Sequence, residues 1–186
     1  RSLANSRSTM PADPTDRFTV KVLLYAIEPV ISRRFSIRAT ANFKDFHRAL
    51  QDAMGWRDLH LHEFRHGKGK RLTKVIADDD PDVVKGDEFK EQTTVTLASF
   101  VGRRELPLRL LYRYDFNEDW IHEITIEEKS TGEKSTKPII IDGERACPPE
   151  DCGGPELFMD ALRGELEFLD DRYDPAHFDP KKVKFR

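Results

Sequence analysis

Cysteine is scarce in this chain, which carries only Cys147 and Cys152 among its 186 residues. Two cysteines are too few for the disulfide framework of a small secreted domain, so we expect reduced thiols and a cytoplasmic location. Structural zinc knuckles need two pairs of closer cysteines, and redox pairs are more often separated by two residues than by four. We expect a rigid loop whose cysteines pack against the sheet. A disulfide formed under oxidation, or a mixed site of one cysteine with His122, is the alternative.

Long apolar runs and an excess of one charge are also missing. No stretch is long enough to span a bilayer, and residues 1–16 hold no signal-like apolar segment, so no membrane partner is expected. The 31 basic and 34 acidic side chains give a net charge of -3. The overall charge therefore does not favour nucleic-acid binding, and only a local basic patch could bind nucleic acid.

The length suits one domain with a proper core and is short for two. Residues 1–16 are rich in Ser, Pro and Asp, which predicts a flexible tail. Residues 17–186 are expected to form a single α+β domain.

The domain opens with strands and one clear helix. Phe18–Ile27 and Ile31–Ile37 read as a β-hairpin. Asn42 is a good N-cap for a helix that ends before Gly55, with an apolar stripe from Phe43 to Met54. Leu59–His66 is a third strand. Hairpin, helix and strand in this order predict an α+β domain with a β-grasp-like start and a mixed or antiparallel sheet.

The remaining segments are less regular. Residues 67–92 are polar and predict an exposed excursion, and residues 93–101 fit a short strand or a helical turn. Residues 138–142 are a short apolar segment. Pro155–Leu169 is expected to be the second main helix, and Asp179-Pro180 fits the start of a last short helix.

The most informative stretch is a second hairpin. Leu108 to Tyr114 alternate between apolar and polar residues, and so do Trp120 to Ile126. The acidic turn between them contains Asn117, which tolerates a left-handed conformation. This pattern places His122 on the same face as Trp120.

Three histidines suggest a metal site. His60 and His62 alternate on one strand face, and His122, Asp119 or Asp115 can supply a third ligand for zinc with an open position for water. The alternative is that these histidines satisfy polar ends of a half-buried sheet by hydrogen bonding, which Trp120 and Phe64 on the same faces favour.

Other charged groups allow further hypotheses. The acidic turn can serve acid–base chemistry or hold a divalent ion, and the alternative is a turn whose charges are simply solvated. Its carboxylates are Asp115, Glu118, Asp119 and Glu123. The basic residues Lys68, Lys70, Arg71 and Lys74 suit phosphate contacts, and Arg33, Arg34 and Arg38 add positive charge on the second strand. Neither group has a Walker pattern or interleaved aromatics.

Several motifs resemble one known family. They are Gly55-Trp56, His60-Leu-His-Glu-Phe64, Tyr114-Asp-Phe, Asp119-Trp-Ile-His122, Glu144-Arg-Ala-Cys-Pro-Pro-Glu-Asp-Cys-Gly-Gly154 and Phe178-Asp-Pro180. Over residues 18–185 the chain resembles the plasmid open-reading-frame-three-like family, named after a root-inducing plasmid. The resemblance implies a small intracellular α+β protein that is associated with mobile elements and has no established activity.

Some members of that family carry the label of a transposon passenger or TnpR resolvase. A serine recombinase needs an activated serine with arginines that hold phosphate. The serines here lie in the tail, in the second strand at Ser32 and Ser36, or in polar connections, and we assemble no such site from them.

We therefore expect an uncharacterised, non-catalytic binding or interaction protein, with an unknown protein or small molecule as its partner. The alternatives are a metal-dependent hydrolase or nuclease that uses His60, His62 and His122 with a divalent ion such as zinc, and a nucleic-acid-binding accessory factor. The candidate binding residues are His60, His62, Asp115, Asp119, Trp120, His122, Cys147 and Cys152.

Overall fold

The computed structural model describes residues 13–68, 71–83, 88–167 and 169–186. The strands are β1 (Arg17–Leu24), β2 (Ser32–Arg38), β3 (His62–Lys68), β4 (Arg71–Ala77), β5 (Lys90–Glu91), β6 (Leu108–Tyr114), β7 (Trp120–Ser130) and β8 (Ile139–Glu144). The helices are α1 (Phe43–Met54), α2 (Leu97–Val101) and α3 (Gly154–Leu162), with 3₁₀ turns η1 (Gln92–Thr94) and η2 (Pro180–Lys182).

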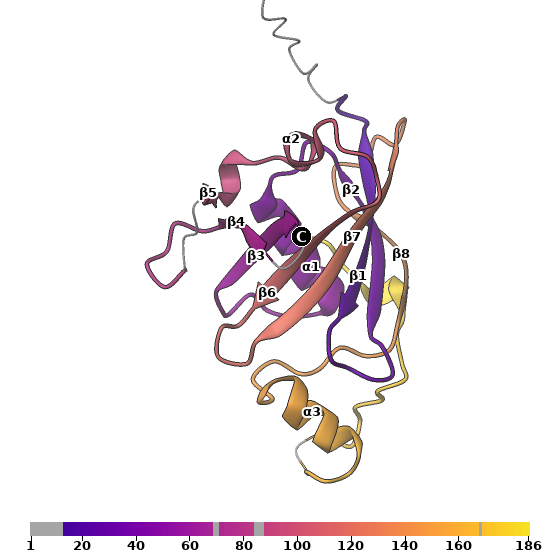
Figure 1. The fold of residues 1–186 in the computed structure, drawn as a ribbon. Coiled ribbons are helices and arrows are strands. Elements are labelled where there is room, and N and C mark those ends of the chain that lie inside the picture. Colours follow the sequence, from indigo (N-terminus) through magenta and orange to yellow (C-terminus); the bar gives the residue numbers. More distant parts are fainter. Residues whose placement is uncertain (1–12, 69–70, 84–87, 168) are drawn as a thin grey trace, which may run out of the picture.

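One twisted sheet organises the molecule (Figure 1). Its strand order is β5-β4-β3-β6-β7-β1-β2-β8, and every neighbouring pair is antiparallel except β4 with β5. This confirms the predicted single α+β domain with a mixed sheet. The β-grasp likeness of the opening is not confirmed, because β1 lies between β2 and β7 and runs antiparallel to both.

Helix α1 forms where the sequence predicts it. The Asn42 side chain accepts a hydrogen bond from the backbone N–H of Asp45, and Asp45 closes the capping box. Gly55 ends the helix at a φ of 84°, a conformation that glycine adopts without a Cβ clash. The apolar face packs on the sheet, with the Phe43 and Phe46 rings 4.9 and 5.4 Å from the ring of Phe64.

The polar excursion predicted over residues 67–92 is wrong for residues 71–77, which form β4. Residues 78, 79, 81 and 82 are exposed as predicted, and residues 69–70 and 84–87 lie outside the described residues. Strand β4 pairs with β3, and Val75, Ile76 and Ala77 are buried. A run of three buried apolar residues is too short to show the alternation of a strand. Because the residues around it are charged, the segment has the sequence pattern of a polar loop. Residues 93–101 contain helix α2, and the apolar segment near residue 139 is edge strand β8, which pairs with β2.

The second main helix is shorter than predicted. Helix α3 ends at Leu162, because Gly164 follows with a φ of 76° and its N–H bonds to the Ala161 carbonyl. Leu157 and Leu166, both within the range predicted for this helix, are exposed. In the hairpin turn the left-handed residues are Asp115 and Asp119, not Asn117.

The two ends of the described chain are attached to the domain. Asp16, which the sequence places in the tail, is buried and forms an ion pair of 2.6 Å with Lys129; residues 1–12 lie outside the described residues. Asp179 accepts the N–H of Lys181 and caps η2, as expected of its position. Among the helices of the described residues, none combines the length and apolarity that crossing a membrane requires.

Candidate functional site

The loop that carries the two cysteines packs over the end of the second hairpin. The Trp56 indole N–H donates to the Pro148 carbonyl at 2.9 Å, and the Tyr114 hydroxyl donates to Glu150 at 2.8 Å. On the other side, the Gly153 N–H donates to Glu118 at 2.6 Å. We call the combination of residues 56–61, 115–119 and 147–154 the hairpin–loop junction. It brings together motifs that lie up to 98 positions apart in the sequence.

Gly154 permits the close approach of this loop. A Cβ at this position would lie 2.7 Å from the Glu118 carbonyl oxygen, and the φ of 88° disfavours any other residue. Helix α3 starts here and lies at the same end of the molecule as the β6–β7 turn (Figure 1).

His60 lies in the junction between two carboxylates. Its Nε2 is 2.8 Å from Asp151 Oδ1 and 3.6 Å from Asp115 Oδ2. Asp115 is buried, and its other oxygen accepts the N–H groups of Asn117 and Glu118 at 3.0 and 3.4 Å. One imidazole and two carboxylates therefore converge at the surface, and the three can hold a cation.

His62 turns to a different set of partners. Its ring stacks on that of His47 from α1, with centroids 3.5 Å apart and planes 4° apart. His62 Nε2 lies 2.8 Å from Gln92 Oε1, and His47 Nε2 lies 2.6 Å from Asp58 Oδ1. Burial lowers the pKa of both rings, to about 4 for His47, so both are neutral near pH 7.

His122 is fully buried and separate from both groups. Its ring contacts Trp56 edge-on at 5.3 Å between centroids and Tyr112 at 5.1 Å. Neither ring nitrogen has a hydrogen-bond partner of good geometry among the described residues. Burial lowers its pKa to about 4 against a smaller opposing effect of the Tyr112 and Trp120 backbone.

The structure thus places the three predicted metal ligands, His60, His62 and His122, in three separate surroundings. Within the described residues, the side-chain groups able to hold an ion are His60–Asp115–Asp151 and His47–Asp58–His62, and neither includes His122. His60 precedes β3, so the alternation that was to place it beside His62 does not apply there.

The other predicted residues have structural partners. The Trp120 indole N–H donates to Glu118 at 2.9 Å and the side chain is buried, while Asp119 pairs with Arg113 at the surface. Cys147 and Cys152 are free, half-buried and packed against the core. Burial raises their pKa values to about 12 and about 11, so neither thiol has the low pKa of a reactive cysteine.

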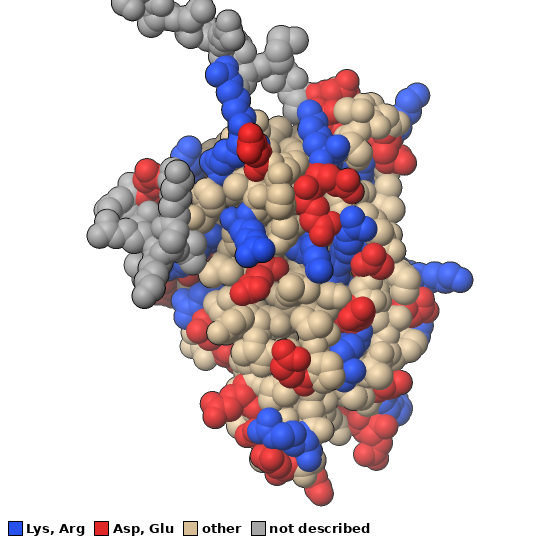
Figure 2. Space-filling view, turned by 45° about the vertical axis from the view of Figure 1, so that its right-hand side comes forward, with Lys and Arg blue, Asp and Glu red and all other residues tan. Residues whose placement is uncertain are grey.

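Cations of the second strand do not form an open basic surface. Arg33 is buried and donates to the Ala53 and Glu144 carbonyls. Arg34 pairs with Glu127 at 2.7 Å. Figure 2 shows acidic and basic side chains intermingled over one face of the molecule. The side chains of the predicted basic residues at 68, 70, 71 and 74 lie outside what the structure describes.

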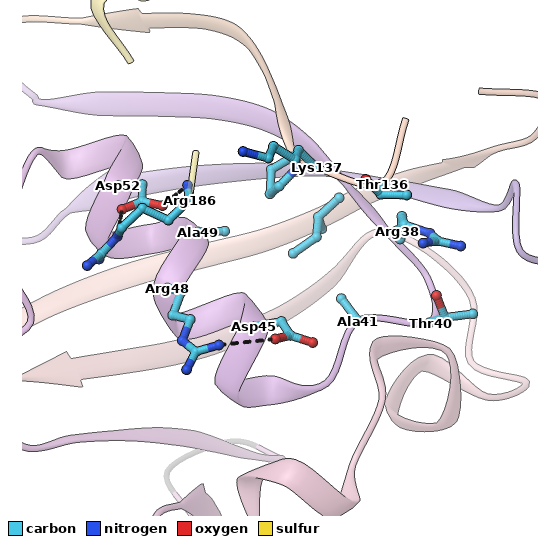
Figure 3. Close-up of a pocket in the computed structure, with 12 residues that line it drawn as sticks. Arg38, Thr40, Ala41, Asp45, Arg48, Ala49, Asp52, Thr136, Lys137 and Arg186 are labelled. Carbon is cyan, nitrogen blue, oxygen red and sulfur yellow. Dashed lines mark hydrogen bonds and ion pairs between the residues drawn. The ribbon is translucent and has the colours of Figure 1, made fainter. Parts of the chain in front are cut away.

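A cavity of about 540 Å³ beside α1 is lined by four basic and two acidic side chains (Figure 3). Among its lining residues, Arg186 pairs with Asp52 at 2.7 Å and Arg48 pairs with Asp45 at 3.8 Å. Two of its cations are therefore neutralised by carboxylates within the same cavity.

Sequence reasoning missed several members of the two histidine groups. His47 follows Phe43 by four residues and precedes Leu50 by three, so it falls on the buried stripe of α1, and that spacing is the signal that was available. Asp58, Gln92 and Asp151 come from loops or a 3₁₀ turn, where no periodic pattern indicates a partner.

Comparisons with known proteins agree with this fold. The family model described as "Plasmid pRiA4b ORF-3-like protein" matches residues 16–182. The chain is 34% identical over 161 residues to the uncharacterized protein y4hQ of Sinorhizobium fredii. The aligned region covers 85% of this chain and 74% of y4hQ. It also resembles the crystal structure of MM3350, a protein of unknown function from Methanosarcina mazei Go1. That match has 30% identity and a TM-score of 0.76, and covers 91% of this chain and 98% of the other.

Proposed function

We propose that this chain, which belongs to the plasmid pRiA4b ORF-3-like family, is a non-catalytic binding protein. Its partner contacts the hairpin–loop junction. The relatives described above are named as uncharacterized or of unknown function, so the proposal rests on geometry. A cytoplasmic location and an association with mobile elements, implied by the two cysteines and the resemblance, belong to the same proposal.

The observation that carries the proposal is a fixed polar surface with an apolar residue at its edge. The loop is held by hydrogen bonds from Trp56 and Tyr114, so its exposed groups have defined positions. Leu59 is 54% exposed and directly precedes His60, whose imidazole contacts the exposed Asp151. Fixed groups of this kind bind without a large ordering cost.

The charge of the junction indicates the class of partner. Its exposed carboxylates are Asp119 and Asp151, whose side chains are 56% and 55% exposed, whereas the side chains of Asp115 and Glu150 are each 5% exposed. An acidic surface beside an exposed leucine suits a basic segment of a protein that also carries an apolar side chain. The three-histidine hydrolase has less support, because His60, His62 and His122 lie in separate surroundings.

A site-specific photo-crosslinker tests this proposal. We expect a crosslinker in place of Leu59 to capture a partner in extracts of the cells that express the protein. The control carries the crosslinker at Ile141, which is 43% exposed on edge strand β8. Capture from position 59 should be lost with Asp151→Lys. Equal capture from both positions, or none from position 59, would refute the proposed surface.

A further inference from the structure

One imidazole and two carboxylates meet in the hairpin–loop junction at distances that suit a metal ion. His60 Nε2 lies 2.8 Å from Asp151 Oδ1 and 3.6 Å from Asp115 Oδ2, and one ligand atom of each residue lies within 4.8 Å of the other two. The three residues come from the segment before β3, the β6–β7 turn and the cysteine-bearing loop. We propose that they bind a divalent metal ion of the zinc class, and that this ion controls the binding of a basic partner at the junction.

The orientation of His60 suits coordination. Its Nε2 and Asp151 Oδ1 are in hydrogen-bond geometry, so this oxygen lies on the side where Nε2 of a neutral imidazole presents its lone pair. A metal takes the place of the proton between the two atoms. Ligand atoms around a four-coordinate zinc lie roughly 3.4 Å apart, so the contact to Asp115 already fits and the contact to Asp151 lengthens by about 0.6 Å. The Asp151 side chain is 55% exposed and can make this shift.

Asp115 is the buried ligand of the group. Its side chain is 5% exposed, and its Oδ1 accepts the N–H groups of Asn117 and Glu118. Its Oδ2 faces His60 and accepts no hydrogen bond from any described residue. A buried carboxylate oxygen without a donor is costly unless a cation or a proton meets it. The hydrogen bonds to Oδ1 hold the carboxylate in place, as hydrogen bonds to metal-binding carboxylates commonly do.

The buried carboxylates of the junction other than Asp115 are engaged within the protein. Glu118 accepts one N–H group from Gly153 and another from the Trp120 indole. Glu150 pairs with Arg57 at 3.0 Å. An ion that enters the junction therefore meets the three proposed ligands and keeps its remaining positions for water. One imidazole with two carboxylates suits zinc and its neighbours better than calcium, which prefers oxygen ligands alone.

The group of His47, Asp58 and His62 is a poorer candidate for the same ion. Its two rings stack face to face, with centroids 3.5 Å apart and planes 4° apart. Because an imidazole offers its lone pair in the plane of the ring, one ion cannot be bound by both rings, and the group offers at most one imidazole with Asp58. Asp58→Asn is therefore a matched control, since it changes an aspartate of the same segment that lies outside the proposed metal site.

The bound ion acts on the surface proposed for the partner, and this part of the inference rests on the proposed function. A divalent ion adds two positive charges to an acidic surface and coordinates Asp151, an exposed carboxylate that a basic segment contacts. It also joins three segments that are distant in sequence. Zn²⁺ should therefore raise the midpoint of thermal unfolding and reduce the binding of the partner.

Zinc binding to the chelator-stripped protein tests the site. Competition with a chromophoric chelator should give about one Zn²⁺ per chain. His60→Gln and Asp151→Asn should each weaken Zn²⁺ binding at least about ten-fold, whereas Asp58→Asn should leave it unchanged. The three side chains are 26%, 55% and 36% exposed, so the variants are expected to fold, which near-UV circular dichroism verifies. The site is overturned if folded wild-type protein binds no stoichiometric Zn²⁺ at micromolar concentrations, or if binding survives both His60→Gln and Asp151→Asn.

The crosslinker at position 59 tests the control of the partner. Adding Zn²⁺ to chelator-treated protein and extract should lower capture several-fold, and His60→Gln should remove this effect of Zn²⁺. Undiminished capture by the Zn²⁺-saturated protein overturns the control of the partner but not the metal site. Absence of capture with and without Zn²⁺ refutes the partner surface and its control together, and the zinc titration then decides the metal site by itself.

Discussion

His122→Phe is predicted to remove a specific part of the acid sensitivity of this protein. The folded protein holds the buried His122 ring neutral down to about pH 4, whereas the unfolded chain protonates it near pH 6.5. Between these values the unfolded state binds the extra proton, so the free energy of unfolding falls as the pH is lowered. Stability from the neutral ring is fully present above pH 6.5 and is lost as the pH falls toward 4.

The magnitude follows from the difference between the two pKa values. Each pH unit in this window is worth about 1.4 kcal/mol, so the loss is about 2 kcal/mol at pH 5 and about 3 kcal/mol at pH 4. Phenylalanine keeps an aromatic ring against Trp56 and Tyr112 and has no nitrogen to protonate. The free energy of unfolding of His122→Phe should therefore rise relative to wild type by about 2 kcal/mol between pH 7 and pH 5.

Urea unfolding at pH 5, 6, 7 and 8 measures this difference. Other groups, including His47 with its pKa of about 4, are common to both proteins and cancel. His122→Leu should show the same pH dependence as His122→Phe even if phenylalanine fits the site poorly. Parallel curves for wild type and His122→Phe, within about 0.5 kcal/mol, would refute a buried neutral imidazole.

Two further predictions concern the cysteine-bearing loop. Gly154→Ala should lower the free energy of unfolding by about 1–3 kcal/mol, and by more than Gly132→Ala does. Both glycines have a positive φ, but only at position 154 would a new Cβ lie 2.7 Å from a backbone carbonyl oxygen. Equal losses of stability in thermal unfolding would contradict the close approach. Trp56→Phe removes the hydrogen bond to Pro148 and should lower the free energy of unfolding by about 1–2 kcal/mol. It should also speed thiol labelling of Cys147. An unchanged labelling rate would show that this hydrogen bond does not hold the loop.

Local signals were enough for a large part of the fold. Helix α1 was predicted with its cap, its stripe and its last residue, because the capping box of Asn42 and the glycine at position 55 act within a few residues. The two hairpins were predicted from alternation. Strand β4 was missed, because its burial depends on pairing with β3 and shows as only three apolar residues, Val75 to Ala77.

The candidate site depended on contacts that no local pattern contains. The family-like motifs include the hairpin turn and the cysteine-bearing loop, and the structure brings the two into contact at Glu118 and Gly153. The partners of the histidines were not predictable, because Asp151 reaches His60 from a position 91 residues away and Gln92 reaches His62 from 30 residues away. Long-range packing decided which carboxylate or amide each ring would meet.

The stretch from Asp58 to His62 shows why alternation alone was misleading here. Alternation places side chains on one face only where the backbone is a strand, and β3 begins at His62. The residues before it follow a loop path in which Asp58 has a φ of 62°, so Asp58 turns to His47 while His60 turns to the cysteine-bearing loop. One short segment thereby supplies side chains to two separate groups.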